Sequence, residues 1–267
     1  MSPTLAQRIG LDPAVAADVA GLHAVHRAYL EHVTYEDIAV QLRESGPLDE
    51  AALTARILSG RGGYCFELNT VLAALLRSLG FSVSYHEGVV GGEGPTNHMV
   101  LIVDFGGERW IADAGLGEGF VDPVPLREGV HPGRGPFSWT LAIEPAGTWW
   151  LGQHEWGSVS GFRMQPEPSP HEAFAPHHRR LSTDPASSFV QTLVVQKPYD
   201  DRIVTLRSRT LSRRGPSMDE KRVLDRDEFG DVLRYEFGIA IDAERRQRLW
   251  TLAAAQHEAF QARAAAI

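Results

Sequence analysis

The spacing of hydrophobic residues divides the chain into a helical first part and a β-rich middle. Apolar residues recur at helical spacing over residues 13–33 and 49–59, and Ser45-Gly46-Pro47 separates the two runs. A third helical stripe begins at Cys65 and continues to Leu79, and Gly80 stands where a helix stop is expected. The N-terminal part of the chain therefore predicts a group of helices.

Downstream of Gly80 the pattern changes to short β-type runs. From Phe81 to about Val195 these runs are broken by glycine and proline, which predicts a small antiparallel barrel or sandwich. Residues 202–211 predict a further strand, and residues 242–264 carry the spacing of a closing helix. Because helices and antiparallel strands occupy separate stretches, the sequence predicts an α+β fold.

The single cysteine, Cys65, stands at the start of the third helical stripe. A helix N-terminus is a source of positive potential, which favours the thiolate that a nucleophilic cysteine needs. The upstream segment Gly60-Arg61-Gly62-Gly63 interrupts regular structure and lets the backbone approach a ligand closely. Cys65 is therefore a candidate nucleophile, and the alternative is a small buried hydrophobic residue.

Two further segments supply candidate partners for the thiol. Asn97–Asp104 predicts a buried strand with His98 at its entrance, and Trp110–Gly117 predicts a short strand with Asp113 near its end. Phe105-Gly106-Gly107-Glu108 joins them as a hairpin, so the two side chains can meet. A histidine that exchanges the thiol proton and a carboxylate that fixes its tautomer would complete a triad. The imidazolium and the helix dipole together can lower a thiol pKa from about 8.5 to roughly 3.5–7.5.

Three motifs contain these residues. Arg61-Gly62-Gly63-Tyr64-Cys65-Phe66-Glu67-Leu68-Asn69 is followed by His98-Met99-Val100 and by Asp113-Ala114-Gly115. Weaker matches lie at Leu22–Ile38, at Leu181–Phe189, and at Phe237–Ile239 with Leu249-Trp250. Together they closely resemble the arylamine N-acetyltransferase family. The resemblance implies that Cys65 accepts the acyl group, His98 acts as its base and Asp113 orients the histidine.

The resemblance also implies a reaction and a fold. An acetyl group would pass from acetyl-coenzyme A to Cys65 and then to an arylamine, arylhydrazine or N-hydroxyarylamine. This is a ping-pong acyl transfer of xenobiotic metabolism that uses no metal. The fold would combine a helical bundle carrying the cysteine (residues 1–84), an antiparallel β-barrel carrying the histidine and aspartate (85–195) and an α/β lid (196–267), with a Cys-His-Asp core of the cysteine-protease type.

The chain departs from the family pattern around the expected pocket. Tyr35 stands where phenylalanine is usual, Leu116 replaces a common aromatic residue, and Asn97 replaces a threonine or serine. Glu36 is retained and, by resemblance, would pair with Arg61 to brace the cysteine loop. The residues expected to contact the acceptor or coenzyme A are Tyr35, Phe66, Asn97, Gly115, Leu116 and Gly117.

Two other reactions remain open for the same three residue types. An amide synthase would release or cyclise a polyketide chain held on a carrier protein. The altered pocket positions Tyr35 and Leu116 keep this alternative open. A papain- or transglutaminase-like thiol hydrolase shares the order Cys65, His98, Asp113 and would use water as the acceptor.

Composition and charge narrow the functional classes. The formal net charge of −8 argues against a general nucleic-acid binder, and no apolar run reaches the ~18 residues of a membrane helix. One cysteine allows no internal disulfide and Met1–Leu5 shows no signal peptide, so we expect a cytoplasmic enzyme, as a monomer or homodimer. His23-x-x-His26 lacks a third metal ligand nearby, and we expect a solvated or capping role for it. His177-His178-Arg179-Arg180 is expected in a solvated loop that could face phosphates.

Overall fold

The computed structural model describes residues 4–265, and Met1–Pro3, part of the segment in which no signal peptide is expected, lie outside this range. The helices are α1 (Leu5–Arg8), α2 (Val19–His32), α3 (Ile38–Gln41), α4 (Glu50–Leu58), α5 (Cys65–Ser78), α6 (Ala175–Thr183), α7 (Ser188–Gln191), α8 (Arg226–Asp231) and α9 (Ala243–Ala265), with short turns of other helix types at His171–Phe174 and Val232–Glu236. The strands are β1 (Tyr35–Glu36), β2 (Ser82–Val90), β3 (His98–Asp104), β4 (Arg109–Ile111), β5 (Val124–Pro125), β6 (Gly129–Pro132), β7 (Ser138–Ile143), β8 (Trp149–Gly152), β9 (Gly161–Ser169), β10 (Val194–Pro198), β11 (Ile203–Arg207), β12 (Thr210–Gly215) and β13 (Met218–Val223).

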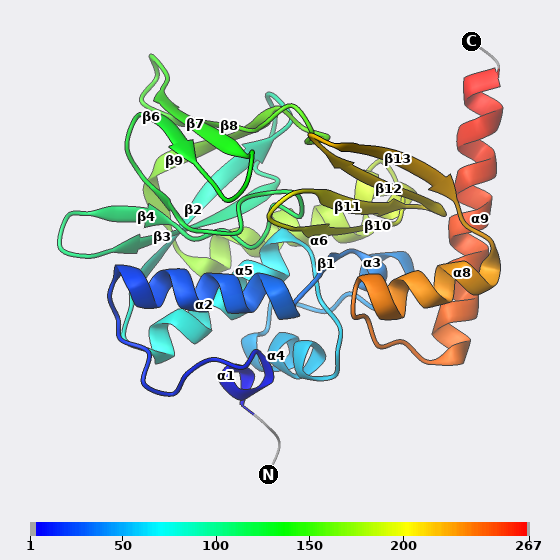
Figure 1. The fold of residues 1–267 in the computed structure, drawn as a ribbon, viewed down its shortest axis with the longest axis horizontal. Coiled ribbons are helices and arrows are strands. Elements are labelled where there is room, and N and C mark those ends of the chain that lie inside the picture. The colour runs from blue at the N-terminus through cyan, green and yellow to red at the C-terminus, as the bar shows by residue number, and fades with distance from the viewer. Residues whose placement is uncertain (1–3, 266–267) are drawn as a thin grey trace.

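These strands form two antiparallel sheets. The larger has eight strands in the order β5-β4-β3-β2-β9-β8-β7-β6 and forms the barrel, and the smaller has five in the order β1-β10-β11-β12-β13. Figure 1 shows α2 and α5 packed below the barrel, the smaller sheet beside it, and α9 standing at the outer edge of that sheet. The predicted α+β class and the antiparallel barrel are confirmed, and the sandwich alternative is not observed within residues 4–265.

Strand β3 is buried on both faces because it lies between two hydrophobic cores. Met99 and Leu101 belong to the core that includes the helices, whereas Val100 and Ile102 belong to the core inside the barrel. Successive side chains of a strand point to opposite faces, so a strand between two cores has an unbroken apolar sequence. His98 begins this strand and is itself buried.

Helix α5 begins at the cysteine because the preceding residue caps it. Tyr64 is the N-cap residue, and its backbone N–H donates to the Glu67 carboxylate at 3.2 Å. At the other end, Gly80 has a φ of 93°, a left-handed conformation that favours glycine and follows the end of a helix. The helix predicted from Cys65 is confirmed.

Two predictions of helix position are wrong. Helix α2 begins at Val19, not near residue 13, because the Asp18 side chain accepts a hydrogen bond from the Gly21 N–H at 2.7 Å and caps the helix there. Residues 177–180, predicted to lie in a solvated loop, belong to α6, which has proline in its first turn and buries His178.

The smaller sheet joins parts of the chain that are far apart in sequence. Strand β1 pairs with β10, so Tyr35 lies opposite Gln196 and Glu36 lies opposite Val195. Strand β10 itself runs across the predicted boundary between residues 195 and 196. The division into three domains therefore stays a prediction, and the pairing brings β1 next to the lid strands.

Candidate active site

The β3–β4 hairpin brings His98 beside Asp113. The two strands pair with Ile102 opposite Ile111, and Asp113 follows β4 closely. His98 Nε2 and Asp113 Oδ2 lie 2.6 Å apart, and each residue is 1% exposed. The structure thus contains the contact that the hairpin predicted, and both side chains are buried.

Cys65 faces the beginning of β3 from the N-terminus of α5. Its thiol donates a weak hydrogen bond to the Asn97 carbonyl oxygen at 3.5 Å, and the residue is 2% exposed. Cys65 and His98 line the same cavity, of about 280 Å³. Because His98 Nε2 bonds Asp113, its Nδ1 is the nitrogen left to exchange a proton with the thiol.

Asn69 ties the cysteine helix to Asp113, a role that the sequence analysis did not identify. Its Nδ2 donates to Asp113 Oδ1 and to the Met99 carbonyl, both at 2.6 Å, and its Oδ1 accepts from the Ala114 N–H at 2.9 Å. Asn69 lies one helical turn after Cys65, so both side chains project from the same face of α5. That spacing was the available signal for its role.

Two glycines let the turn after Asp113 pack against Cys65. A Cβ on Gly115 would lie 2.7 Å from the Cys65 Cα atom, and one on Gly117 would lie 2.6 Å from the Tyr35 ring. Real Cβ atoms do not approach other atoms this closely. The glycines are therefore required for the contact between the turn and the start of α5.

The pKa values of Asp113 and Cys65 are shifted in opposite directions, although both side chains are buried. Burial favours the neutral form of Asp113, but His98 and the hydrogen bonds from Asn69 and Gly115 outweigh it and hold the pKa of Asp113 below its usual value. Burial raises the pKa of the Cys65 thiol, and the Asp113 charge raises it further. The helix start predicted a lowered pKa for the thiol, and that prediction is wrong. The helix start does not offset burial, so a thiolate here requires the positive charge of a protonated His98.

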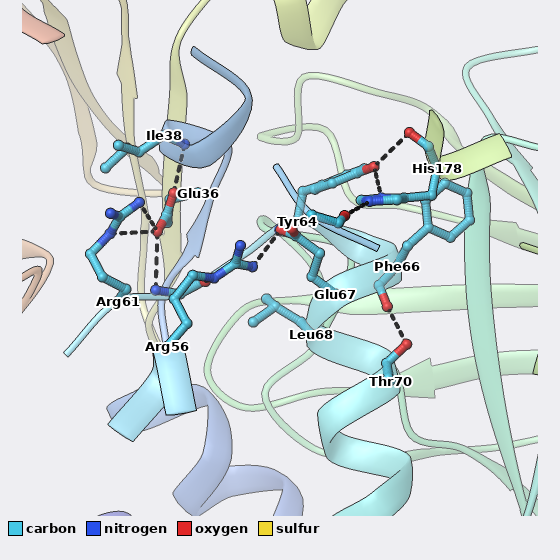
Figure 2. Close-up of polar contacts among 12 residues, drawn as sticks. Glu36, Ile38, Arg56, Arg61, Tyr64, Phe66, Glu67, Leu68, Thr70 and His178 are labelled. Atoms are coloured by element: carbon cyan, nitrogen blue, oxygen red, sulfur yellow. Dashed lines mark hydrogen bonds and ion pairs between the residues drawn. The ribbon is translucent and has the colours of Figure 1, made fainter. Parts of the chain in front are cut away.

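A buried carboxylate braces the loop before the cysteine (Figure 2). Glu36 Oε1 accepts hydrogen bonds from Arg61 Nε at 3.0 Å and from the Gly62 N–H at 3.1 Å, and its Oε2 accepts from the Ile38 N–H at 2.6 Å. Burial favours the neutral acid, but Arg61 and a second arginine hold the pKa of Glu36 below its usual value. The Glu36–Arg61 pair that the resemblance implied is present.

A second buried network joins the N-cap of α5 to α6 (Figure 2). Arg56 pairs with Glu67 at 2.7 Å, and Glu67 is bonded to the Tyr64 backbone. The Tyr64 hydroxyl donates to His178 Nδ1 at 2.5 Å, and His178 Nε2 donates to the Gly46 carbonyl at 2.7 Å. His178 therefore has a structural role, and its predicted place in a solvated loop is wrong because α6 packs over the start of α5.

Most residues predicted for the pocket line the cavity that contains Cys65 and His98. They are Tyr35, Asn97, Gly115, Leu116 and Gly117. The Asn97 side chain itself is held by the backbone of β2, where its Oδ1 accepts from the Val90 N–H at 2.8 Å. Leu116 therefore contributes an aliphatic wall at the place where the family commonly has an aromatic one.

Phe66 lies elsewhere. Its ring is fully buried and packs against Tyr64 and Phe174, with ring centroids 5.8 and 5.9 Å away. One step along a helix rotates the side chain by about 100°. The residue after Cys65 therefore turns into the helical core and does not line the cavity.

His26 is a core residue and not a solvated one, which corrects the expectation for the His23-x-x-His26 motif. Its Nδ1 donates to the Val121 carbonyl at 2.9 Å, and its ring stacks on Phe120. Within residues 4–265 no group of three or more His, Cys, Asp or Glu side chains is placed to hold a metal ion. No helix in the described part of the chain is long and apolar enough to cross a membrane.

Comparison with known proteins gives one consistent family. A sequence model described as N-acetyltransferase matches residues 18–246. The arylamine N-acetyltransferase / N-hydroxyarylamine O-acetyltransferase of Salmonella typhimurium is 37% identical over 126 residues, which are 45% of this chain and 44% of that relative. The arylamine N-acetyltransferase of Mycolicibacterium smegmatis is 30% identical over 254 residues, which are 87% of this chain and 89% of that relative. The solved arylamine N-acetyltransferase from Mycobacterium abscessus matches with a TM-score of 0.86 at 26% identity, over 93% of both chains.

A relative with a different activity in its name is also similar along most of its length. The proansamycin X synthase of Amycolatopsis mediterranei is 26% identical over 242 residues, which are 85% of this chain and 92% of that relative. The family match contains all three residues of the candidate triad. With this coverage and the shared fold, the chain belongs to the arylamine N-acetyltransferase family.

Proposed function

We propose that this chain transfers an acetyl group from acetyl-coenzyme A, through an acetyl-Cys65 intermediate, to an arylamine, arylhydrazine or N-hydroxyarylamine. The observation that carries the proposal is that Cys65 and His98 line one cavity and that Asp113 holds His98 Nε2 from behind, with 2.6 Å between the two atoms. The activities of the relatives from Salmonella typhimurium and Mycolicibacterium smegmatis support the acetyl group and the arylamine and N-hydroxyarylamine acceptors.

In the first half-reaction, the thiol proton of Cys65 moves to His98 Nδ1 and the thiolate attacks the thioester carbonyl. The backbone N–H groups of Phe66 and Met99 lower the pKa of the Cys65 thiol, so they support the negative charge on the attacking sulfur. The bond to the coenzyme A sulfur then breaks. The imidazolium returns its proton to that sulfur, and coenzyme A leaves as a thiol.

In the second half-reaction, the amine attacks the acetyl-thioester on Cys65. His98 Nδ1 takes a proton from the amine nitrogen, the carbon–sulfur bond breaks, and the proton passes to the cysteine sulfur. The Asp113 carboxylate stays ionised throughout, because its lowered pKa keeps it charged at neutral pH. It thereby stabilises the imidazolium in both steps.

Intact-protein mass spectrometry tests the proposal directly. After brief incubation with acetyl-coenzyme A and no amine, we expect one added acetyl group on the wild-type protein. The Cys65→Ser variant removes the thiol with little change in size and should show none. A wild-type protein that turns over arylamine without an acetyl adduct would overturn the covalent route, and acetylation that persists in the variant would overturn the assignment of Cys65.

An amide synthase is the second candidate, and similarity to the proansamycin X synthase favours it. Leu116 and Tyr35 at the cavity are the positions that depart from the acetyltransferase pattern. The same mass experiment separates the two, because an amide synthase would accept an acyl chain from a carrier protein and leave acetyl-coenzyme A untouched. A thiol hydrolase would instead release acetate without any amine present.

Cellular location and assembly complete the proposal. A single cysteine suits the reducing cytoplasm, where acetyl-coenzyme A is available. The proposed enzyme acts there on small molecules, as a monomer or homodimer, without a nucleic-acid or membrane partner. Size-exclusion chromatography with light scattering measures the oligomeric state.

A further inference from the structure

One arginine reaches the catalytic cavity from the smaller sheet. Arg207 ends β11 opposite Val194 of β10, and it lines the cavity that contains Cys65. Among the described residues that line this cavity, it is the one with a permanent positive charge. Its side chain is exposed and forms no ion pair within residues 4–265, whereas Arg213 on the adjacent strand pairs with Glu236 at 2.6 Å.

Glu118 is the one carboxylate among the described residues that line this cavity, and it accepts hydrogen bonds from other donors. It is 3% exposed, and its Oε1 accepts from the Ser158 N–H at 2.6 Å, the Ser158 hydroxyl at 2.8 Å and the Val159 N–H at 3.1 Å. Its Oε2 accepts from Gln196 Nε2 at 3.2 Å. These donors satisfy both oxygens, so Glu118 fixes the wall and leaves the Arg207 guanidinium for a ligand.

Arg207 also lies where the catalytic cavity meets a larger one. A second cavity of about 520 Å³ shares Arg207, Glu118 and Ser158 with the first. The other side chains of the second cavity that are charged at neutral pH are three cations and one anion: Arg214, Lys221, Arg263 and Asp219. Positive charge is therefore in excess around the junction, which favours an anionic group at Arg207.

We propose that Arg207 is a specificity-determining residue that selects acceptors carrying an anionic group on the aromatic ring, away from the reacting amine. The inference rests on the proposed function, because it assigns a substrate class to the same cavity. With the amine at the acetylated Cys65, the guanidinium binds a carboxylate through the planar, charge-assisted hydrogen bonds that suit this group. A neutral ring substituent gains much less at the same place.

A phosphate of the donor is also an anion that accepts hydrogen bonds from a guanidinium. The size of the cavity favours the carboxylate of the acceptor as the group that Arg207 binds. In acetyl-coenzyme A the long pantetheine arm separates the thioester from the phosphates. The cavity that both Cys65 and Arg207 line measures about 280 Å³, a size that suits an acceptor with one aromatic ring. Steady-state kinetics of donor and acceptor separate the two sources.

The test compares 4-aminobenzoate with its neutral isostere 4-aminobenzamide, using the Arg207→Gln variant of the full chain. We expect the KM for 4-aminobenzoate to rise about tenfold, the low end for a charge-assisted hydrogen bond at an exposed side chain. The KM for 4-aminobenzamide and the KM for acetyl-coenzyme A should stay within about twofold. Arg209→Gln, a nearby arginine that lines neither cavity, is the matched control and should change none of these values.

Two results would overturn the assignment of Arg207. An equal rise in KM for the charged and the neutral acceptor would make it a packing residue. A rise confined to acetyl-coenzyme A would make it a phosphate contact of the donor. Mass detection of acetyl-Cys65 in each variant keeps the two proposals apart. Normal acetylation without charge discrimination refutes only the acceptor assignment, and absent acetylation of the wild type refutes the proposed function.

Discussion

Replacing Asp113 by asparagine isolates the role of a single charge, because the two side chains have nearly the same shape. Asp113 Oδ1 accepts hydrogen bonds from Asn69 Nδ2 at 2.6 Å and from the Gly115 N–H at 2.7 Å, whereas Oδ2 faces only His98 Nε2. In Asp113→Asn the amide oxygen must take the Oδ1 position, where two donors point. Its NH₂ group then faces His98 and donates to Nε2.

That orientation gives His98 the wrong tautomer. With Nε2 as acceptor, the ring proton sits on Nδ1, and Nδ1 cannot take a proton from the Cys65 thiol. Reversing the amide would leave two buried donors unpaired at about 1–3 kcal/mol each, so the productive orientation is disfavoured by at least about 2 kcal/mol, or roughly 30-fold. Loss of the charge that stabilises the imidazolium adds to this, and the same change in a serine triad costs about 10⁴-fold. We expect acetyl transfer to fall about 10³- to 10⁴-fold.

The assay measures acetylation of Cys65 by acetyl-coenzyme A and transfer to an arylamine side by side, with circular dichroism and thermal melting to show that the fold is kept. Asp104→Asn is the matched control. Asp104 lies at the far end of β3 and caps the hairpin turn by accepting from the Gly106 N–H at 2.7 Å. Its variant should transfer acetyl normally. An Asp113→Asn variant that keeps more than about a tenth of wild-type transfer would refute the tautomer argument.

Two further predictions concern ionisation. In His98→Ala, burial raises the pKa of the Cys65 thiol with no imidazolium to oppose it, so the pH midpoint of iodoacetamide alkylation should rise from below about 7 to above about 8.5; equal midpoints in both proteins would rule out the ion pair. In Glu36→Gln, the buried partner Arg61 loses its counter-charge, and urea unfolding at pH 7 should show a loss of about 3 kcal/mol. Because the pKa of Glu36 is lowered in the fold, its contribution is complete above about pH 4.3 and is lost as the pH falls further; a difference between the two proteins that is unchanged at pH 3 would contradict this account.

The parts of the site that the sequence predicts are those set by local chain geometry. A helical stripe that begins at Cys65 fixes the cysteine at a helix start, and a tight connection between two strands fixes His98 against Asp113. The unbroken apolar run of β3 indicates burial on both faces. Each of these inferences needs only the periodicity and the turn chemistry of neighbouring residues.

The parts that the sequence does not predict depend on contacts between distant segments. Arg207 reaches the cavity because its strand β11 pairs with β10, and β10 pairs with β1, a pairing that no local pattern encodes. His178 lies on the buried face of α6, and the polar composition of this helix gives no sign of that face in the sequence. The pKa of the Cys65 thiol also follows from long-range packing, because burial overrides the helix start that the local pattern correctly placed.

The enclosure of Cys65 also determines how long an acyl group would survive on it. A thioester on Cys65, a residue that is 2% exposed, meets the water molecules that occupy the cavity of about 280 Å³. An aromatic amine that fills the same space displaces those molecules while it places its nitrogen at the carbonyl. Aminolysis then prevails over hydrolysis because the amine occupies the space beside the carbonyl, even though water is far more abundant. The choice between a transferase and a hydrolase is therefore made by the walls of the cavity, since the three residues at its base would serve both reactions.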